Sequence, residues 1–375
     1  MIKATEISCC GCGACESVCG HKAIKITTDE LGFVMPEVDS MKCVDCGLCD
    51  RLCPMLSERK TRAKGPRCFA ARNLDISEVE TSRSGAIFPL IYELFVRDNG
   101  VVYGAGFDDN FRVVHKRATT AKDCKEFKGS KYAQSDATEI YKSVRKDLAE
   151  GFKVLFSGTP CQIYALNNYI PHKLKERLLT VDIICHGVAA PKVWSDYTDY
   201  IEKKEGHKIV SANFRDKQIY GWDGLHRESF VFDNKKQHTY PITFYQPFLI
   251  RKACHQCRFC SIYRESDITL GDLWNWESVC KEMNADGRGV SMVMCNTEKG
   301  EKTITEISQS LQLKELDMAD CMQHNLEEPT AEDPRRIEFA NFYPNHTFDQ
   351  VIKQFWPLSM SEKVKYCIKR IIGKA

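Results

Sequence analysis

Residues 9–19 read CCGCGACESVC, and residues 43–54 read CVDCGLCDRLCP. Each stretch includes four cysteines separated by two, two and three residues, namely Cys9, Cys12, Cys15 and Cys19, then Cys43, Cys46, Cys49 and Cys53; Cys10 is an additional cysteine in the first stretch. A triplet with a fourth cysteine suits a cubane of iron and sulfide, which four thiolates hold. Zinc sites use paired cysteines instead, and a disulfide framework would need an oxidising compartment. The two stretches therefore predict two 4Fe–4S clusters, which transfer single electrons.

The spacing also predicts how the ligands are shared. It is typical of two-cluster bacterial ferredoxins, in which the fourth cysteine of each run ligates the other cluster. The two expected ligand sets are Cys9, Cys12, Cys15 and Cys53 for one cluster, and Cys43, Cys46, Cys49 and Cys19 for the other. Residues 23–36 alternate enough to form a short hairpin between the two halves. Gly20 replaces the proline expected after Cys19, which changes a turn and removes no ligand.

The composition limits the class of protein. A chain of 375 residues is too long for one ferredoxin unit and predicts two or three domains. Its 53 basic and 51 acidic residues give a net charge of +2, which gives no reason to expect a nucleic acid or a strongly charged partner. The N-terminus has no apolar signal segment, and no run of 18 apolar residues occurs. With twenty cysteines, we expect a protein of the reducing cytoplasm.

The domain organisation follows from these patterns. From residue 84 to 205, expected strands and helices alternate, which is typical of a mixed α/β fold. The expected regions are a ferredoxin domain (1–56), a charged linker (57–67), a first α/β region (68–150), a second α/β region with a further cysteine group (151–325) and a helical basic tail (326–375). The fold class is thus a multidomain α+β and α/β protein. The tail could lie on an anionic membrane surface, but a solvated helix packed by one face is the favoured interpretation.

Local patterns locate the expected elements of the α/β regions. Helices are expected at 86–97, 136–149, from Pro160 onward and at 191–204, and strands at 101–103, 111–114, 154–156, 178–185 and within 207–295. Thr159 is the expected cap of the third helix, with Pro160 at its first position. Gly104-Ala-Gly106 is followed by another strand rather than a helix, so it does not indicate a dinucleotide-binding loop.

A further cysteine group lies about 200 residues after the first two. Cys254, Cys257 and Cys260 repeat the triplet spacing, which predicts a third 4Fe–4S cluster with one ligand from elsewhere. Cys161 at a helix start and Cys185 at a strand end are the candidates for that ligand. Zinc or a single redox pair are the alternatives for the triplet. The other single cysteines, Cys68, Cys124, Cys280, Cys295, Cys321 and Cys367, are expected to be small buried apolar residues.

Several segments, in this order, resemble the beta subunits of coenzyme F420-reducing hydrogenases and dehydrogenases, of the bacterial type with an N-terminal two-cluster ferredoxin domain. They are residues 82–85 (SRSG), 128–132 (KGSKY), 157–162 (SGTPCQ), 181–187 (VDIICHG), 214–217 (FRDK) and 266–274 (SDITLGDLW). The resemblance implies an α/β domain that binds FAD, a cubane cluster beside the flavin, and a substrate site at the flavin face. It also implies a cluster ligand set of Cys161, Cys185, Cys254 and Cys257. The spacing instead favours Cys260, so the choice between Cys185 and Cys260 stays open.

The resemblance further implies which residues surround the flavin. They are Ser84, Gly85, Lys128, Gly129, Ser130, Lys131, Tyr132, Gly158 and Thr159. Small residues let a ring or a pyrophosphate approach the backbone, and lysines can neutralise its charge. Without the resemblance, the favoured interpretation of Lys128 and Lys131 would be that they lie in a solvated loop. His186 could donate a proton near the flavin or substrate, although a structural histidine at a strand end is the favoured interpretation.

Together these features predict an iron–sulfur flavoprotein oxidoreductase. It would exchange electrons with a ferredoxin-like partner or partner subunit and with a small two-electron substrate, either F420 or another organic molecule. A non-catalytic electron-transfer subunit of a larger redox complex is one alternative. A zinc-stabilised binding module that keeps a ferredoxin domain is the other.

Overall fold

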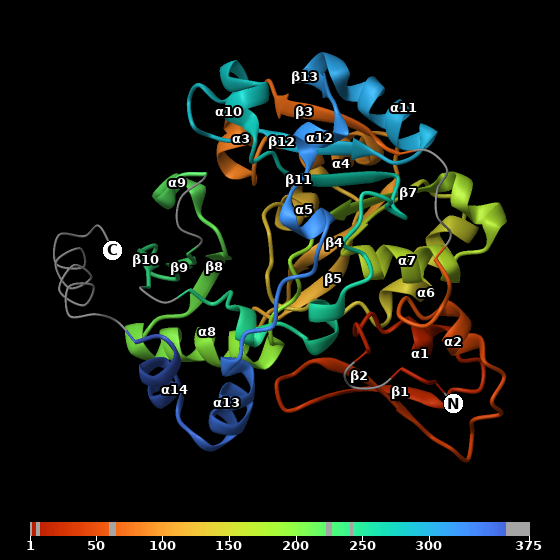
Figure 1. Ribbon diagram of the computed structural model, residues 1–375, viewed down its shortest axis with the longest axis vertical. Coiled ribbons are helices and arrows are strands. Elements are labelled where there is room, and N and C mark those ends of the chain that lie inside the picture. The colour runs from red at the N-terminus through yellow and green to blue at the C-terminus, as the bar shows by residue number, and fades with distance from the viewer. Residues whose placement is uncertain (1, 5–7, 60–64, 223–226, 241–242, 358–375) are drawn as a thin grey trace.

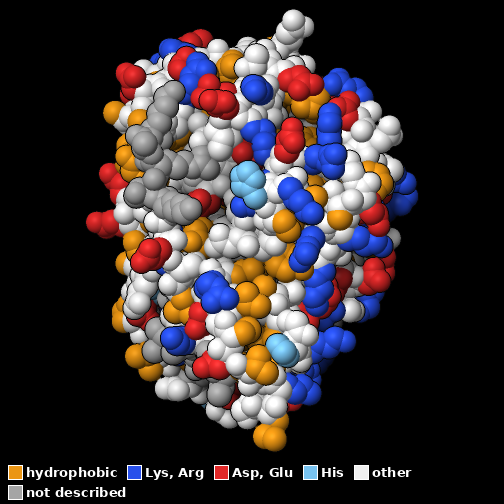
Figure 2. Space-filling model, turned by 90° about the vertical axis from the view of Figure 1, so that its right-hand side faces the viewer, with side chains coloured by type: hydrophobic (Ala, Val, Ile, Leu, Met, Phe, Trp, Pro, Cys, Tyr) orange, Lys and Arg blue, Asp and Glu red, His pale blue; other side chains and the backbone are white. Residues whose placement is uncertain are grey.

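The computed structural model describes residues 2–4, 8–59, 65–222, 227–240 and 243–357 (Figure 1). An N-terminal module lies against an α/β body built on a large sheet, and a smaller sheet with its own helices lies beside this body. The part of the chain that the structure describes contains no helix long and apolar enough to cross a membrane. On the face shown in Figure 2, acidic and basic side chains are interspersed with exposed hydrophobic ones.

The N-terminal module consists of one hairpin and two short helices. The antiparallel strands are β1 (Ile24–Thr28) and β2 (Val34–Val38), which confirms the hairpin expected there. The helices are α1 (Ala14–Val18) and α2 (Leu48–Leu52). Each helix follows a glycine in the left-handed conformation, Gly13 with φ 78° and Gly47 with φ 70°. A side chain at either position would strain the turn that leads from one cysteine ligand to the next.

The body is organised around one eight-stranded mixed sheet. The strands, in spatial order, are β13 (Leu311–Leu316), β3 (Arg67–Asn73), β12 (Ser291–Cys295), β11 (Ile268–Asp272), β7 (Leu178–Ile183), β6 (Val154–Gly158), β4 (Val101–Phe107) and β5 (Val113–Ala118). The sequence regions on either side of residue 150 therefore contribute to the same sheet. Gly104 and Gly106 lie inside β4, in agreement with the absence of a dinucleotide-binding loop there.

Four neighbouring strands at the centre of this sheet are parallel. β11 pairs with β7, β7 with β6, and β6 with β4, all in parallel. Their carboxyl ends consequently meet at one edge of the sheet. In open α/β sheets this edge is where ligands bind, and the segments with Thr159, Cys185 and Trp274 follow directly after β6, β7 and β11.

Helices cover both faces of the sheet. The helices α4 (Ile87–Arg97) and α11 (Glu298–Ile307) bury apolar side chains on one face, and α6 (Ile140–Ala149) and α7 (Pro160–Tyr169) do so on the other. The N-terminal module joins this second layer, since α1 contacts α6 and α7, and α2 contacts α7. Ala14 and Leu52 belong to the same apolar core as Ile163 and Val144.

The smaller sheet has an aromatic core of its own. Its strands are β8 (Ile209–Asn213), β9 (Ser229–Phe232) and β10 (Gln237–Thr239), and the helices α8 (Pro191–Glu205), α13 (Arg335–Phe342) and α14 (Phe348–Phe355) pack with it. Trp194 and Phe214 lie at the centre, with ring centroids 4.1 Å apart. The remaining short helices are α3 (Ile76–Thr81), α5 (Ala121–Cys124), α9 (Lys217–Tyr220), α10 (Trp276–Val279) and α12 (Met318–Cys321).

Several expected boundaries differ from the structure; the strand expected at 111–114, for example, is β5 at Val113–Ala118. The helix expected from residue 136 begins at Ile140, because the Asp136 carboxylate accepts bonds from the Thr138 N–H and hydroxyl and forms a turn ahead of the helix. The strand expected to end at Cys185 ends at Ile183. The expected basic tail contains α13 and α14, but residues 358–375, with most of its lysines, lie outside the described residues.

Candidate functional site

The eight N-terminal cysteines gather in two groups around two small spaces. One space is lined by Cys9, Cys12, Cys15 and Cys53, and the other by Cys19, Cys43, Cys46 and Cys49. These are the two sets expected from the spacing, with the fourth cysteine of each run crossing to the other group. Burial raises the pKa of Cys15 to about 12, and the neighbouring Cys9 and Cys53 add to the effect. Thiolates in this setting need a compensating positive charge, which iron supplies.

Five cysteines from three distant segments surround a third space. Its lining includes every candidate ligand of the predicted third cluster: Cys161, Cys185, Cys254, Cys257 and Cys260. A hydrogen bond from the Cys260 thiol lowers the pKa of Cys257 to about 6, whereas burial raises the pKa of Cys254 to about 12. Within the described ranges, no three His, Cys, Asp or Glu side chains converge closely enough to hold a single metal ion.

Local structure explains how these segments approach one another. Thr159 and Gln162 form a capping box at the start of α7, and the Thr159 hydroxyl lies 3.2 Å from the sulfur of Cys161. Gly187, with φ 105°, permits the backbone after Cys185 to pass close to the 254–260 loop. A Cβ at this position would lie 2.6 Å from Ile250 and 3.2 Å from the Cβ of Cys254.

Cys10 is a residue that the ligand spacing did not single out. Its thiol is in hydrogen-bond contact with the thiols of Cys12 and Cys161, and the contact with Cys12, together with burial, raises its pKa. Cys10 lines both the space of the first ferredoxin group and the space of the third cysteine group. It therefore stands between the two. The adjacent pair Cys9-Cys10 could have indicated this role from the sequence. Two consecutive side chains point in different directions, so only one of them can face the first cluster.

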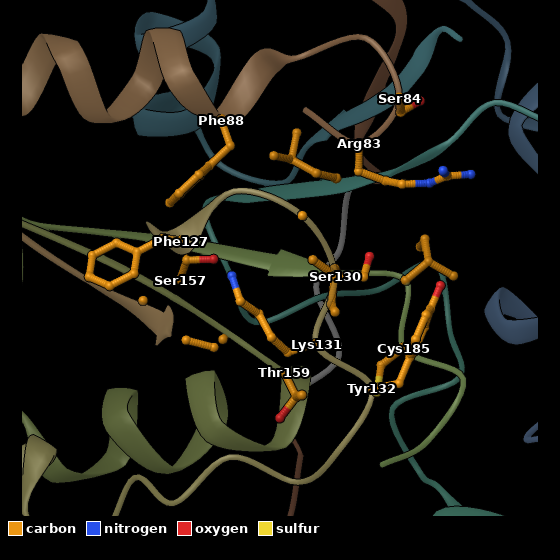
Figure 3. A pocket seen from close by; sticks show the side chains of 18 of the residues that line it. Arg83, Ser84, Phe88, Phe127, Ser130, Lys131, Tyr132, Ser157, Thr159 and Cys185 are labelled. Carbon is orange, nitrogen blue, oxygen red and sulfur yellow. The ribbon is translucent and has the colours of Figure 1, made fainter. Parts of the chain in front are cut away.

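A larger cavity of about 260 Å³ lies at the carboxyl-end edge of the parallel strands (Figure 3). The loop between η1 (Lys125–Phe127) and α6 forms one side of it, and the segments that follow β6, β7 and β11 form another. Phe88 and Phe127 provide an apolar wall. Cys185, His186, Gly187 and Thr159 line both this cavity and the third cysteine group, so the two spaces share a wall.

Comparison with known proteins identifies the family. The profile for the C terminus of the coenzyme F420 hydrogenase/dehydrogenase beta subunit matches residues 151–320, and that of the 4Fe-4S dicluster domain matches residues 8–56. One subunit of the F(420)H(2) dehydrogenase of Methanosarcina mazei is 20% identical over 319 residues, 82% of this chain and 84% of that protein. Residues 151–320 therefore belong to the F420 hydrogenase/dehydrogenase beta-subunit family, and residues 8–56 form a 4Fe–4S dicluster domain. The chain is thus an iron–sulfur protein of the oxidoreductase type with an N-terminal ferredoxin domain, as expected from the sequence.

Two other similarities are weaker in coverage or in fold. The coenzyme F420-dependent sulfite reductase of Methanocaldococcus jannaschii is 25% identical over 325 residues, which are 82% of this chain and 48% of that protein. The chain therefore spans about half the length of this relative. A chain of the F420-reducing [NiFe] hydrogenase complex from Methanosarcina barkeri aligns with a TM-score of 0.46 and 17% identity, over 70% of this chain and 89% of the other. That similarity is too low to transfer a site.

Eight of the nine residues expected around a flavin in this family line the large cavity. They are Ser84, Lys128, Gly129, Ser130, Lys131, Tyr132, Gly158 and Thr159. Gly85 does not line it. A Cβ on Gly85 would lie 2.3 Å from the carbonyl oxygen of Ala71, so this glycine allows the loop to pack tightly on β3 and β12.

The two lysines of the 128–132 segment are held by protein groups. The Lys128 ammonium pairs with the Glu78 carboxylate at 2.6 Å. The Lys131 ammonium donates to the carbonyl oxygens of Glu126 and Lys128 at 2.5 and 2.9 Å, and burial lowers its pKa to about 7. Charge on Lys131 therefore depends on what occupies the cavity beside it, whereas the Lys128 charge is already neutralised.

Two histidines line the cavity. His186, the candidate proton donor, keeps an exposed side chain at the cavity wall, and partial desolvation lowers its pKa. Its backbone oxygen accepts bonds from Tyr245 and Thr330. His115 on β5, which the sequence did not indicate, is buried with its pKa lowered to about 4 by burial, so it is neutral. Its Nε2 donates to the Ser157 carbonyl at 3.1 Å, and its Nδ1 has no hydrogen-bond partner among the described residues.

Proposed function

We propose that this chain is an iron–sulfur flavoprotein oxidoreductase that passes electrons between a ferredoxin-like partner and a small two-electron substrate. The substrate is F420 or another small organic molecule. The chain would hold three 4Fe–4S clusters and one FAD for this purpose. The observation that carries the proposal is that the spaces adjoin one another. Cys10 lines both the space of the first ferredoxin group and that of the third cysteine group, and Cys185 lines both the latter space and the large cavity.

The first link joins the ferredoxin module to the third cysteine group. The thiol of Cys10 contacts those of Cys12 and Cys161. Arg251 reinforces this junction, because its buried guanidinium donates to the Cys9 carbonyl at 2.6 Å while its own carbonyl accepts the Cys254 N–H at 2.9 Å. A rigid junction keeps the distance between two redox sites fixed, and it excludes water from between them.

The second link joins the third cysteine group to the large cavity. The segment from Cys185 to Val188 and the capping pair Thr159 and Gln162 separate the two spaces and line both. A cofactor in the large cavity would therefore be separated from the third group by a single layer of residues. This arrangement favours electron exchange between the two sites.

The large cavity has features that suit a flavin ring. Its volume of about 260 Å³ is close to the lower end of the range of cofactor pockets, about 300–1,000 Å³. The unpartnered Nδ1 of His115 can accept a hydrogen bond from a ring N–H, since its Nε2 carries the proton. Lys131, Gly129 and Ser130 can hold the polar edge. When bound, a flavin couples one-electron carriers to two-electron chemistry.

The second ferredoxin group, at the end of the proposed series of redox sites farthest from the large cavity, lies at the surface. Cys46 of the second ferredoxin group is exposed, as are the neighbouring Val44 at 59% and Met41 at 93%. The first ferredoxin group is mostly buried. We therefore propose that an external partner docks at the 41–48 loop and exchanges electrons there, and that the group of Cys9, Cys12, Cys15 and Cys53 lies second in the series.

One observation favours a second candidate, an electron-transfer subunit that acts inside a larger complex. The relative from Methanosarcina mazei, whose length this chain covers to 84%, is described as a subunit. In that case the partner at the surface would be another subunit. Turnover of a two-electron acceptor by the isolated chain separates the two candidates.

The test uses protein reconstituted anaerobically with iron, sulfide and FAD. Reduced ferredoxin is added, and the loss of flavin absorbance is followed with time. Cys254→Ala is expected to lose about four irons, to keep the ferredoxin cluster signals and to lose flavin reduction. Cys280→Ala is the matched control, because Cys280 is buried in a separate core. Unchanged flavin reduction in Cys254→Ala would contradict the proposed route, and failure to bind flavin would remove the oxidoreductase proposal.

A further inference from the structure

We propose that the end of the large cavity beside Arg83 and Arg215 binds an anionic group of the substrate, so that the substrate is a planar organic anion with a carboxylate or other oxoanion. This inference rests on the proposed function and names the class of substrate for the same site. Arg83 and Arg215 both line the cavity, together with Asp272, Trp274 and His186. Figure 3 shows Arg83 reaching along the wall on the same side as Tyr132 and Cys185.

The charges at this end do not balance. Arg215 pairs with Asp272 at 2.6 Å, and the Nε of Arg83 lies 3.9 Å from the same carboxylate. Asp272 is the single carboxylate that lines the cavity among the residues described. Two guanidinium groups thus share one negative charge in a largely buried wall. Buried charges are normally paired, and the Nε atoms of Arg83 and Arg215 have no hydrogen-bond partner among the described residues, so an anionic group of a ligand would complete this cluster.

A third basic side chain, Lys217, lies behind this wall. The Lys217 ammonium donates to the carbonyl oxygens of Ser84 and Arg288, at 3.0 and 2.8 Å. Burial lowers its pKa to about 7, and repulsion from Arg83 adds to this effect. Burial would raise the pKa of the Asp272 carboxyl, but Arg83 and Arg215 outweigh it and hold the pKa below its ordinary value. Both guanidinium groups therefore act on the same single carboxylate.

The two arginines are held in fixed positions before any ligand binds. The carbonyl oxygen of Trp222 accepts bonds from Arg83 at 2.6 Å and from Arg215 at 3.0 Å. The Trp222 indole N–H donates to Asp272 at 2.9 Å. A pre-organised pair of guanidinium groups loses little conformational entropy when it binds an oxoanion, and such groups match the planar geometry of a carboxylate.

An aromatic side chain next to the arginines favours an organic anion over an inorganic one. Trp274 lines the cavity, stacks on Trp222 with centroids 5.4 Å apart, and remains 40% exposed. The Arg215 guanidinium lies 5.1 Å from the Trp274 ring centroid. An exposed indole beside a cationic pair offers apolar contact for a ring and charge for its substituent.

The location favours the substrate over the pyrophosphate of FAD as the source of the anion. His186 lines the cavity together with Asp272 and Arg215, lines the space of the third cysteine group as well, and follows Cys185 in the chain. The anion site therefore lies on the side of the cavity nearest the third cysteine group. A reacting ring must be near that group, whereas a pyrophosphate need not be.

The test measures binding of nicotinate and of its neutral isostere nicotinamide to FAD-reconstituted protein by calorimetry. Nicotinate is expected to bind about 10- to 100-fold more tightly, the range for a hydrogen bond to a charged group. Arg215→Gln and Arg83→Gln should each abolish most of that preference while FAD stays bound, and Arg215→Lys should retain part of it. Arg97→Gln, which removes an exposed arginine from α4, should change nothing. Near-UV circular dichroism checks that each variant is folded.

Three results would overturn the inference. Equal affinity of the wild-type protein for nicotinate and nicotinamide would remove the anion site. A loss of FAD affinity in Arg215→Gln with the nicotinate preference intact would assign these arginines to the pyrophosphate. Displacement of nicotinate by an equal concentration of inorganic phosphate would remove the preference for a planar body. Absence of FAD from the wild-type protein instead contradicts the proposed function, and the nicotinate preference can still be measured in that protein.

Discussion

Arg251→Met is the substitution that most directly separates the ferredoxin module from the body. Arg251 is 2% exposed, and its side chain reaches from the 251–260 loop into the N-terminal module. It donates to the carbonyl oxygens of Cys9 at 2.6 Å and Val34 at 2.9 Å, and to the amide oxygen of Gln134 at 3.1 Å. Methionine fills a similar volume but donates no hydrogen bond.

The expected magnitude follows from the acceptors left behind. Three buried oxygen atoms lose a charged donor, and breaking such a buried network costs about 3–5 kcal/mol. For a chain of this length the entropy of unfolding is about 0.8 kcal/mol per kelvin, so the midpoint of thermal unfolding should fall by about 4–6 °C. The junction through Cys10 should loosen as well, which slows flavin reduction by ferredoxin more than it affects iron content.

The assay combines thermal unfolding under anaerobic conditions with the flavin-reduction experiment. Arg97→Met is the control, because Arg97 is 71% exposed and its ion pair with Glu306 is long, at 3.7 Å. This control should shift the midpoint by no more than about 1 °C. A midpoint for Arg251→Met equal to that of the control, with an unchanged rate of flavin reduction, would refute the structural role assigned to Arg251.

Three further predictions concern other positions. Cys10→Ala should keep all iron, because Cys10 belongs to neither ferredoxin ligand set. Electron transfer to the third cysteine group should nevertheless become slower, because Cys10 lies between the two spaces. Loss of iron in this variant would show that Cys10 is itself a ligand. Gly187→Ala should lose about four irons, because the new Cβ would lie 2.6 Å from Ile250; full iron content would contradict the close-packing argument. Burial raises the pKa of Glu228 to about 8, so the folded state retains a proton that the unfolded state loses near pH 4.5. Stability should fall as pH rises from about 4.5 to 8, by at most about 1.4 kcal/mol per unit, and Glu228→Gln should remove this fall in urea unfolding at several pH values.

The ferredoxin module could be anticipated from the sequence because its ligands are local. Spacing of two and three residues fixes which cysteines can reach one cluster, and the crossing of Cys19 and Cys53 follows from the pseudo-repeat. The structure groups the eight cysteines in this way. The capped helix at Thr159-Pro160 was equally local, since a capping box and a proline define its start within four residues.

Contacts between distant segments could not be anticipated in the same way. The pairing of β3 with β12 and β13, about 220 residues later in the chain, joins regions that looked separate in the sequence. Arg83, Arg215 and Asp272 come from three separate segments, and nothing local marks them as neighbours. The two lysines near the cavity were expected to meet a ligand, but Glu78 and backbone carbonyls from other segments hold them.

The number of clusters and the presence of flavin are the central claims of this account. Iron, zinc and flavin content per chain, measured on protein purified or reconstituted without oxygen, tests both directly. Three cubanes predict about twelve irons, no stoichiometric zinc and one bound FAD. About eight irons with one zinc, or twelve irons with no flavin bound after reconstitution, would contradict the proposed series of redox sites.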